Sequence, residues 1–238
     1  MEKMKLYCIP YSGGSAEIYL KWKKLFPENI SIIPVELAGR GKRMKELFYE
    51  SCEEAVKDLA DVIEDDMKEG EKYAILGHSM GSLLAFETYY ELLRRGCCMP
   101  VHMFMSGRKA PQNIQKKTAF YLLPEEEFLK VVFAYGGSTP AAMENATLRK
   151  LFLPILRADF KIAEIYEYIP RTEKIMCPVT ILNGTKDYSV LEYDLSEWSE
   201  FAGSDFCIKQ VEGGHFFIME NMEDTVAVIT EVLEKTFY

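Results

Sequence analysis

The stretch Tyr73-Ala74-Ile75-Leu76-Gly77-His78-Ser79-Met80-Gly81 leads directly into Ser82-Leu83-Leu84-Ala85-Phe86-Glu87. Its first four residues predict a buried strand, and the residues after Gly81 have the apolar spacing of a helix. A Gly-x-Ser-x-Gly pentapeptide between a strand and a helix is typical of a nucleophile elbow, in which the Ser hydroxyl projects from the tip of a sheet. The pentapeptide alone recurs by chance, so an acid and a histidine in the right order further along are needed to support it.

Strand-like runs alternate with helical patterns along the chain. The predicted strands are Lys5–Pro10, Ile30–Leu37, Tyr73–Leu76, Val101–Ser106, Val179–Leu182 and Phe206–Val211. Several of these runs are almost continuously apolar, as buried parallel strands are. Helical signals include a capping box at Ser51-Cys52-Glu53-Glu54, a terminating glycine at Gly96 and an amphipathic pattern over Thr225–Phe237. This alternation predicts an α/β fold with a mostly parallel sheet flanked by helices.

Residues 109–172 interrupt the alternation and contain no convincing strand. They contain a helix that begins at Pro124–Glu127, a break at Gly136–Ser138 and a long helix around Leu148–Tyr166 that Pro154 should kink. A helical insertion between two strands is expected to cover the carboxyl edge of the sheet. We therefore predict a helical lid over residues 109–172, inserted within a single domain that spans 1–238.

Composition and charge exclude several function classes. A chain of 238 residues can bury a sizeable core without disulfides or metals. Its net charge of −9 and pI near 5.1 argue against nucleic acid as a partner. No apolar run approaches the ~18 residues of a membrane span. The segment before Pro10 is interpreted as a first strand, not a signal peptide, so no membrane partner is expected.

The six cysteines are Cys8, Cys52, Cys97, Cys98, Cys177 and Cys207. They form no Cys-x-x-Cys motif and no Cys/His cluster with metal-ligand spacing. Because no export signal is visible, we expect all six to be reduced thiols in a cytoplasmic protein, with no metal site.

Two residues further along follow predicted strands and complete the pattern that Ser79 begins. Asp187 comes in a turn directly after Val179–Leu182, and His215 comes in a Gly-Gly-His loop after Phe206–Val211. Ligands of an open α/β sheet bind at the carboxyl ends of its strands. The order Ser, Asp, His is that of triad members in α/β-hydrolases. The sequence therefore predicts an α/β-hydrolase fold with Ser79 as nucleophile, His215 as general base and acid, and Asp187 as the orienting acid.

Other interpretations of these residues stay open. Asp187 could be only a turn former, and His215 could be a loop residue that caps the next helix. The rival acids are Asp194 and Asp205. Of the other histidines, His102 alternates with apolar neighbours and is expected to be a hydrogen-bonded sheet residue. His78 occupies the variable elbow position and is expected to pack under the turn.

An oxyanion hole needs two backbone N–H groups, and one is expected from Met80, the residue after the nucleophile. The other is expected from the loop Pro10-Tyr11-Ser12-Gly13-Gly14-Ser15, which follows the first predicted strand and has the glycines that such a loop needs. Ser12 N–H is the predicted donor, and Tyr11 N–H is the alternative. A turn that is merely rich in small residues is the other interpretation of this loop.

Several pieces of the chain together match a known family. They are Cys8–Ala16 with Tyr19 and Trp22, Glu36–Arg40, the elbow Gly77–Gly81, Phe152–Phe160 with Glu164 and Tyr166, Cys177–Val179, Gly184–Asp187 and Gly213–Phe217. Spread over nearly the full length, they make the chain resemble the type II (external) thioesterases of nonribosomal peptide and polyketide assembly lines. The chain departs from the family in three places: Ser12 stands where Ala is frequent, Ala38 where Pro is frequent, and Gly41-Lys42 where an acidic pair is usual.

The resemblance implies a hydrolase of acyl or aminoacyl thioesters on the phosphopantetheine arm of acyl or peptidyl carrier proteins, which clears stalled or wrongly primed carriers. That arm belongs to the substrate, and the resemblance implies no cofactor for the enzyme itself. A carboxylesterase, a fatty-acyl carrier thioesterase or an acyltransferase on the same scaffold is the alternative, and a non-catalytic binding protein is a third interpretation. We expect a monomer.

Carrier domains are commonly acidic, so we expect a locally basic docking surface despite the negative net charge. Two groups of cations follow predicted strands and fall at the carboxyl edge. They are Arg40, Lys42, Arg43 and Lys45, and Arg108, Lys109, Lys116 and Lys117. We predict that some of them steer the carrier, with an ordinary solvated charge face as the alternative.

Overall fold

The computed structural model describes residues 3–113, 119–136 and 145–236. Its central sheet has six strands in the order β2-β1-β3-β4-β5-β6, and each neighbouring pair is parallel. The strands are β1 Met4–Ile9, β2 Ile30–Pro34, β3 Lys72–His78, β4 His102–Ser106, β5 Val179–Gly184 and β6 Phe206–Val211. The six predicted strands and the parallel sheet are therefore confirmed.

Four strands differ in length from the prediction, and β2 and β3 differ the most. β2 ends at Pro34, and Val35 and Leu37 beyond it are buried in the core as part of a loop. β3 is longer than predicted, because Gly77 and His78 still pair with residues of β4. The strand therefore runs directly up to Ser79.

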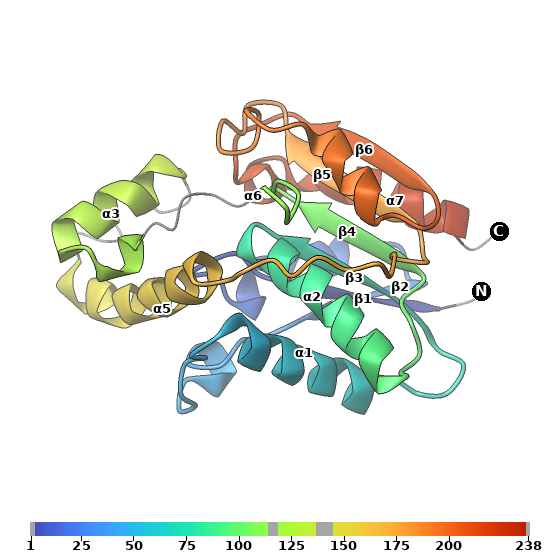
Figure 1. Ribbon diagram of the computed structural model, residues 1–238, viewed down its shortest axis with the longest axis horizontal. Coiled ribbons are helices and arrows are strands. Elements are labelled where there is room, and N and C mark those ends of the chain that lie inside the picture. The colour runs from blue at the N-terminus through green and yellow to red at the C-terminus, as the bar shows by residue number, and fades with distance from the viewer. Residues whose placement is uncertain (1–2, 114–118, 137–144, 237–238) are drawn as a thin grey trace.

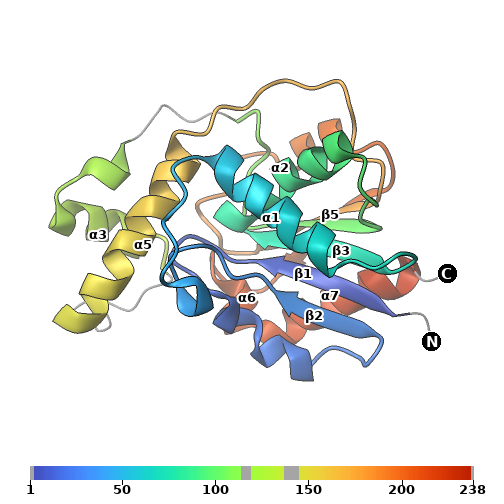
Figure 2. The same cartoon turned by 90° about the horizontal axis from the view of Figure 1, so that it is seen from below.

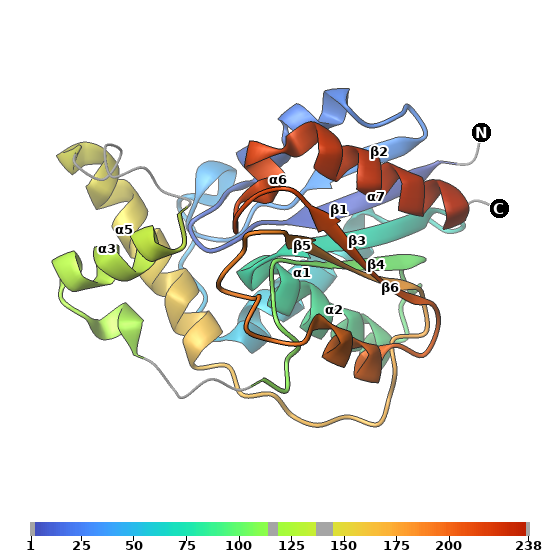
Figure 3. The same cartoon turned by 90° about the horizontal axis from the view of Figure 1, so that it is seen from above.

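Helices cover both faces of the sheet. The α-helices of the described residues are α1 Cys52–Asp66, α2 Met80–Arg95, α3 Glu125–Ala134, α5 Ala146–Glu164, α6 Phe217–Glu220 and α7 Met222–Thr236, and α1, α2 and α7 pack on the faces of the sheet. The view from below brings α1 and α2 to the front (Figure 2), and the view from above brings α7 to the front (Figure 3). Tyr7 and Ile9 of β1 join the core under α1 and α2, whereas Leu6 and Cys8 join the core under α7, because successive strand residues point to opposite faces.

The predicted helix ends have the expected caps. Ser51 Oγ accepts a hydrogen bond from Glu54 N–H at 3.2 Å, and the Glu54 carboxylate accepts one from Glu50 N–H at 2.7 Å. This differs from the usual capping box only in that the second bond reaches one residue further back. Gly96 ends α2 in the left-handed conformation, with φ 71°. In the described part of the chain, no helix has the length and apolarity needed to cross a membrane.

Between β4 and β5 the chain leaves the sheet and forms α3 and α5. These helices lie beyond the end of the sheet that is opposite the two chain termini (Figure 1). They pack against each other through a small core of Phe128, Leu129, Val132 and Leu156. The predicted break at Gly136–Ser138 falls partly on residues 137–138, outside the described residues. Because the parallel strands start on the side of the N-terminus, α3 and α5 lie at the carboxyl edge of the sheet.

Candidate active site

Ser79 lies at the turn between the end of β3 and the start of α2. Its backbone has φ 55° and ψ −113°, and in the described residues it is the one non-glycine with a positive φ. A Cβ on Gly77 would overlap the backbone of Gly81, and a Cβ on Gly81 would overlap the carbonyl of Ile9. Both glycines are therefore needed to let α2 approach the strands this closely. The turn holds the strained Ser79 at the carboxyl end of β3.

The structure brings the three predicted triad residues within hydrogen-bonding distance. His215 Nε2 lies 3.0 Å from Ser79 Oγ, and His215 Nδ1 lies 2.8 Å from Asp187 Oδ2. Asp187 follows β5 and His215 follows β6; they are 1% and 8% exposed. The rival acids lie elsewhere, since Asp194 caps the short helix at Leu195–Phe201 and Asp205 precedes β6 at the amino edge. The arrangement suits a hydroxyl whose proton passes to a His that a buried carboxylate orients.

Ser189 also contacts this group, and the sequence analysis missed it. Its hydroxyl donates to Asp187 Oδ1 at 2.6 Å, and its N–H donates to the same oxygen at 3.1 Å. The hydroxyl also lies 3.2 Å from His215 Nδ1. The available signal was the spacing, because an Asp side chain often accepts from the residue two positions on. Both donors of Ser189 therefore bond to Asp187 Oδ1, the carboxylate oxygen that does not face the imidazole.

The other two histidines occupy the structural places expected of them. His78 is buried under the turn with Nδ1 2.8 Å from Ser106 Oγ, and its ring centroid lies 5.2 Å from that of His215. Burial, together with the nearby His215, holds the pKa of His78 well below its usual range. His102 Nε2 lies 2.9 Å from Thr180 Oγ1 within the sheet. The predicted place of His78 is confirmed. His102 is a sheet residue as predicted but is hydrogen-bonded through Nε2 alone, since its buried Nδ1 has no partner among the described residues.

His102 makes the stability of the fold depend on pH. Burial lowers the pKa of His102 to about 4, whereas the unfolded chain has the ordinary value of about 6.5. As pH falls, the unfolded state binds the proton first, so this stability is complete above pH ~6.5 and is lost down to pH ~4. The loss amounts to about 3 kcal/mol. We expect the free energy of unfolding, measured in urea, to fall less steeply over this pH range for His102→Gln than for the wild type. Parallel curves for the two proteins would contradict the assignment of this pH dependence to His102.

The loop after β1 lies beside the elbow. Gly14 N–H donates to Tyr11 O at 2.8 Å and Gly13 has φ 81°, which are the features of a tight turn with Ser12 at its second position. Ser12 and Met80 both line the cavity around Ser79, as does Tyr11. Met80 is the first residue of α2, so its N–H is among the amino-terminal donors that a helix leaves unpaired. The loop and the start of α2 thus both border the cavity at Ser79, and the assignment of their N–H groups to an oxyanion hole stays a prediction.

A cavity of about 440 Å³ opens at Ser79. The sheet loops form one wall, and the inserted segment forms the other. The lining residues from α3, α5 and the residue after α3 are Val132, Tyr135, Leu156, Phe160, Ala163 and Glu164. This volume lies in the range of small-molecule sites. Among the described residues, no group of three or more His, Cys, Asp or Glu could hold a metal ion, and all six cysteines are unpaired.

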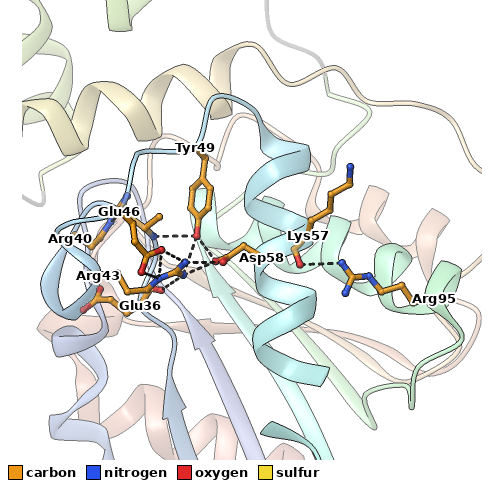
Figure 4. A network of polar contacts seen from close by, with 9 residues as sticks. Glu36, Arg40, Arg43, Glu46, Tyr49, Lys57, Asp58 and Arg95 are labelled. Atoms are coloured by element: carbon orange, nitrogen blue, oxygen red, sulfur yellow. Dashed lines mark hydrogen bonds and ion pairs between the residues drawn. The ribbon is translucent and has the colours of Figure 1, made fainter. Parts of the chain in front are cut away.

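Two of the cations predicted to face a carrier are engaged in ion pairs. Arg40 and Asp159 form a pair at 2.6 Å with both side chains only 2% exposed, so the prediction that Arg40 could meet a carrier is wrong. Arg43 pairs with Asp58 at 2.6 Å and also contacts Glu46 (Figure 4). The sequence alone does not show whether a basic residue will be paired with a carboxylate from a distant part of the chain.

The remaining predicted cations lie in two places. Arg108 and Lys109 line the cavity, where burial lowers the pKa of each. Lys42 and Lys45 are exposed in the loop after β2. Lys116 and Lys117 lie outside the described residues. Of the described candidates, Lys42 and Lys45 are therefore the pair on the outer surface.

Known proteins share both this fold and this sequence pattern. The family model of the thioesterase domain matches residues 4–236. Gramicidin S biosynthesis protein GrsT of Aneurinibacillus migulanus is 32% identical, over 97% of this chain and 89% of that protein. ClbQ from the colibactin NRPS/PKS pathway has a crystal structure that matches with a TM-score of 0.93 and 30% identity, over 99% and 98% of the two chains. YbtT, the type II thioesterase of the yersiniabactin NRPS/PKS pathway, matches with a TM-score of 0.87 and 25% identity, over 100% and 95%. The chain therefore belongs to the thioesterase family, with an α/β-hydrolase fold.

Proposed function

We propose that this thioesterase hydrolyses acyl or aminoacyl groups from the phosphopantetheine arm of carrier protein domains and so clears stalled or wrongly primed carriers in a peptide or polyketide assembly line. The observation that carries the proposal is the relay Ser79–His215–Asp187, which opens into a cavity walled by α5. Family membership and the NRPS/PKS pathways of the similar proteins support the choice of substrate.

Acylation begins when Ser79 Oγ attacks the thioester carbonyl carbon while His215 Nε2 accepts the hydroxyl proton. The carbonyl oxygen becomes an oxyanion, which accepts hydrogen bonds from Met80 N–H and Ser12 N–H. The tetrahedral intermediate collapses as the C–S bond breaks, and the imidazolium returns the proton to the departing sulfur. A thiolate is a good leaving group, so this step needs less help than the cleavage of an amide.

Deacylation repeats the sequence with water as the nucleophile. His215 takes a proton from water, the hydroxide oxygen bonds to the acyl carbon, and Ser79 Oγ leaves with the proton that His215 returns. Asp187 keeps the Nδ1 proton facing itself and stabilises the imidazolium in both half-reactions. The sum is thioester plus water giving a carboxylic acid and the free pantetheine thiol.

The proposal is tested with matched substrates that differ in one atom. Purified protein is given an acyl-pantetheine thioester and the corresponding oxygen ester, then acyl carriers of graded chain length, including acetyl and aminoacyl forms. We expect a higher kcat/KM for the thioester and a further gain when the arm is attached to a carrier. A clear preference for the oxygen ester would overturn the proposal in favour of a carboxylesterase. The monomeric state and the cytoplasmic location stay predictions.

Carrier docking is expected to use the exposed loop after β2. Lys42 and Lys45 flank Met44, which is 56% exposed, and Leu47 beyond them is 90% exposed. A basic pair next to exposed apolar side chains suits an acidic carrier that also presents an apolar contact. Lys42→Glu with Lys45→Glu should raise KM for an acyl carrier by about tenfold, as expected for lost electrostatic steering, and leave KM for acyl-pantetheine unchanged.

The matched control is a second double reversal, Lys23→Glu with Lys24→Glu. These exposed lysines precede β2 and so lie toward the amino edge of the sheet. Their reversal makes the same change in net charge, and neither lysine is among the residues that line the cavity. Equal effects of the two double variants, or an equal rise in KM for the free arm, would contradict docking at the loop after β2.

A further inference from the structure

We propose that the buried ion pair Arg40–Asp159 positions the oxyanion loop and ties its geometry to the placement of α5. Both residues act through the backbone of the loop and are positioning residues. The inference rests on the proposed function, because it concerns the hole that serves Ser79.

The pair is bidentate and enclosed. Arg40 Nη1 lies 2.6 Å from Asp159 Oδ2, and Arg40 Nη2 lies 2.6 Å from Asp159 Oδ1. Two parallel bonds fix the relative orientation of the side chains as well as their distance. Taking two charges out of water is costly, and apolar residues of similar size often serve stability equally well. Stability alone therefore does not explain the buried pair, and its role is inferred from the residues that it contacts.

Both members of the pair bond directly to the loop after β1. Asp159 Oδ2 accepts from Gly13 N–H at 2.7 Å, and Arg40 Nη1 donates to Gly14 O at 3.0 Å. Gly13 and Gly14 immediately follow Ser12, the proposed oxyanion donor. The ion pair thus holds the two residues that follow Ser12. Gly14 N–H in turn donates to Tyr11 O at 2.8 Å, and that carbonyl belongs to the peptide unit that carries Ser12 N–H, so the hold on Gly14 reaches the proposed donor.

A second contact from α5 reaches the same point of the loop. Leu156 lies one turn before Asp159 on α5, and a Cβ on Gly13 would lie 2.5 Å from Leu156 Cδ2. Gly13 is therefore enclosed between an apolar side chain and a carboxylate of one helix, with no space for a side chain of its own. Leu156 also lines the cavity.

As a consequence, the position of α5, which forms part of the cavity wall, is coupled to the geometry of the oxyanion hole. If α5 moved away from the sheet, Gly13 N–H would lose its acceptor and Arg40 would lose its counterion. The oxyanion donors would then no longer be fixed, and a displacement of about 1 Å in an active site can cost ~10²-fold in rate. The hole is therefore complete only while α5 is docked on the loop.

The decisive variant replaces both charges, Arg40→Met with Asp159→Leu. A single replacement would leave one buried charge unpaired and could unfold the protein, whereas the double variant removes both charges together with the bonds to the loop. We expect it to fold, with kcat for acyl-pantetheine lowered by ~10²-fold and KM within about twofold of the wild type. Affinity for an alkyl boronic acid, which forms a tetrahedral adduct on Ser79, should fall by a similar factor.

The matched control is Arg43→Met with Asp58→Leu. This pair joins the same loop after β2 to α1 and is drawn in Figure 4. Among the hydrogen bonds of the described residues, none joins Arg43 or Asp58 to Gly13 or Gly14. We expect the control to keep kcat within about threefold of the wild type, because the oxyanion donors stay in place. An equal loss of kcat in the control would overturn the proposal, since general loosening would then explain both.

Three further outcomes decide the matter. A folded Arg40→Met, Asp159→Leu variant with wild-type kcat overturns the proposal. If that variant fails to fold, Arg40→Lys replaces it. Lysine keeps the charge but cannot bond both Asp159 oxygens and Gly14 O in the fork geometry, so kcat should fall by about tenfold at unchanged KM. An unchanged kcat in Arg40→Lys would overturn the proposal. A wild-type protein without thioesterase activity would instead sink the proposed function.

Discussion

Ser79→Ala is expected to lower kcat/KM for an acyl-pantetheine thioester by about 10⁴- to 10⁶-fold. Without the hydroxyl no acyl-enzyme can form, and only the oxyanion donors and the binding cavity remain to assist water. The substitution removes one oxygen atom and leaves the turn otherwise as it is, so the variant should unfold at nearly the same urea concentration. Single-turnover release of the free thiol, followed with a chromogenic disulfide, measures the loss without interference from multiple turnovers.

Ser12→Ala is the matched control for that experiment, because it makes the same chemical change in the same cavity. Ser12 is proposed to act through its backbone N–H, which alanine retains, so kcat should stay within about threefold of the wild type. A Ser79→Ala variant that kept more than about 1% of the wild-type rate would show that another group attacks the thioester, since nucleophile loss elsewhere costs far more.

The parts of the fold that the sequence predicted well are those with local signals. Apolar runs identify strands, and the glycines at Gly77 and Gly81 identify a turn in which side chains would overlap the backbone. Asp187 and His215 could be proposed because a parallel sheet brings its strand ends to one edge, so position after a strand is enough to predict proximity. These inferences need no knowledge of which side chains touch.

Interactions between distant elements were the part that could not be predicted. Arg40 and Asp159 are 119 residues apart, and nothing near either residue shows that the loop after β2 meets α5. The sequence therefore predicts Arg40 on a docking surface, although the structure buries it. Ser189 was missed for a different reason: its spacing from Asp187 is common in turns, and only the position of His215 gives the hydroxyl a catalytic neighbour.

Asp187→Asn should lower kcat by about 10⁴-fold at neutral pH with little change in KM, because the substitution is expected to leave the histidine in the wrong tautomer. The reason lies in Ser189, whose backbone N–H can only donate and points at Asp187 Oδ1 from 3.1 Å. The carbonyl oxygen of the asparagine must occupy that position, so its NH₂ group faces His215 Nδ1. A donor facing Nδ1 places the imidazole proton on Nε2, which lies 3.0 Å from Ser79 Oγ and then cannot accept the hydroxyl proton.

Ser189→Ala separates this effect from simple loosening of the turn. It removes the 2.6 Å bond from the hydroxyl to Asp187 Oδ1 but keeps the backbone N–H that fixes the carboxylate, so the tautomer is unchanged. We expect a loss in kcat of about tenfold or less, the scale of one hydrogen bond outside the proton path. Tautomer control predicts that kcat decreases in the order wild type, Ser189→Ala, Asp187→Asn, with the large decrease between the two variants. Equal losses in the two variants would instead leave Asp187 as a residue that only shapes the turn.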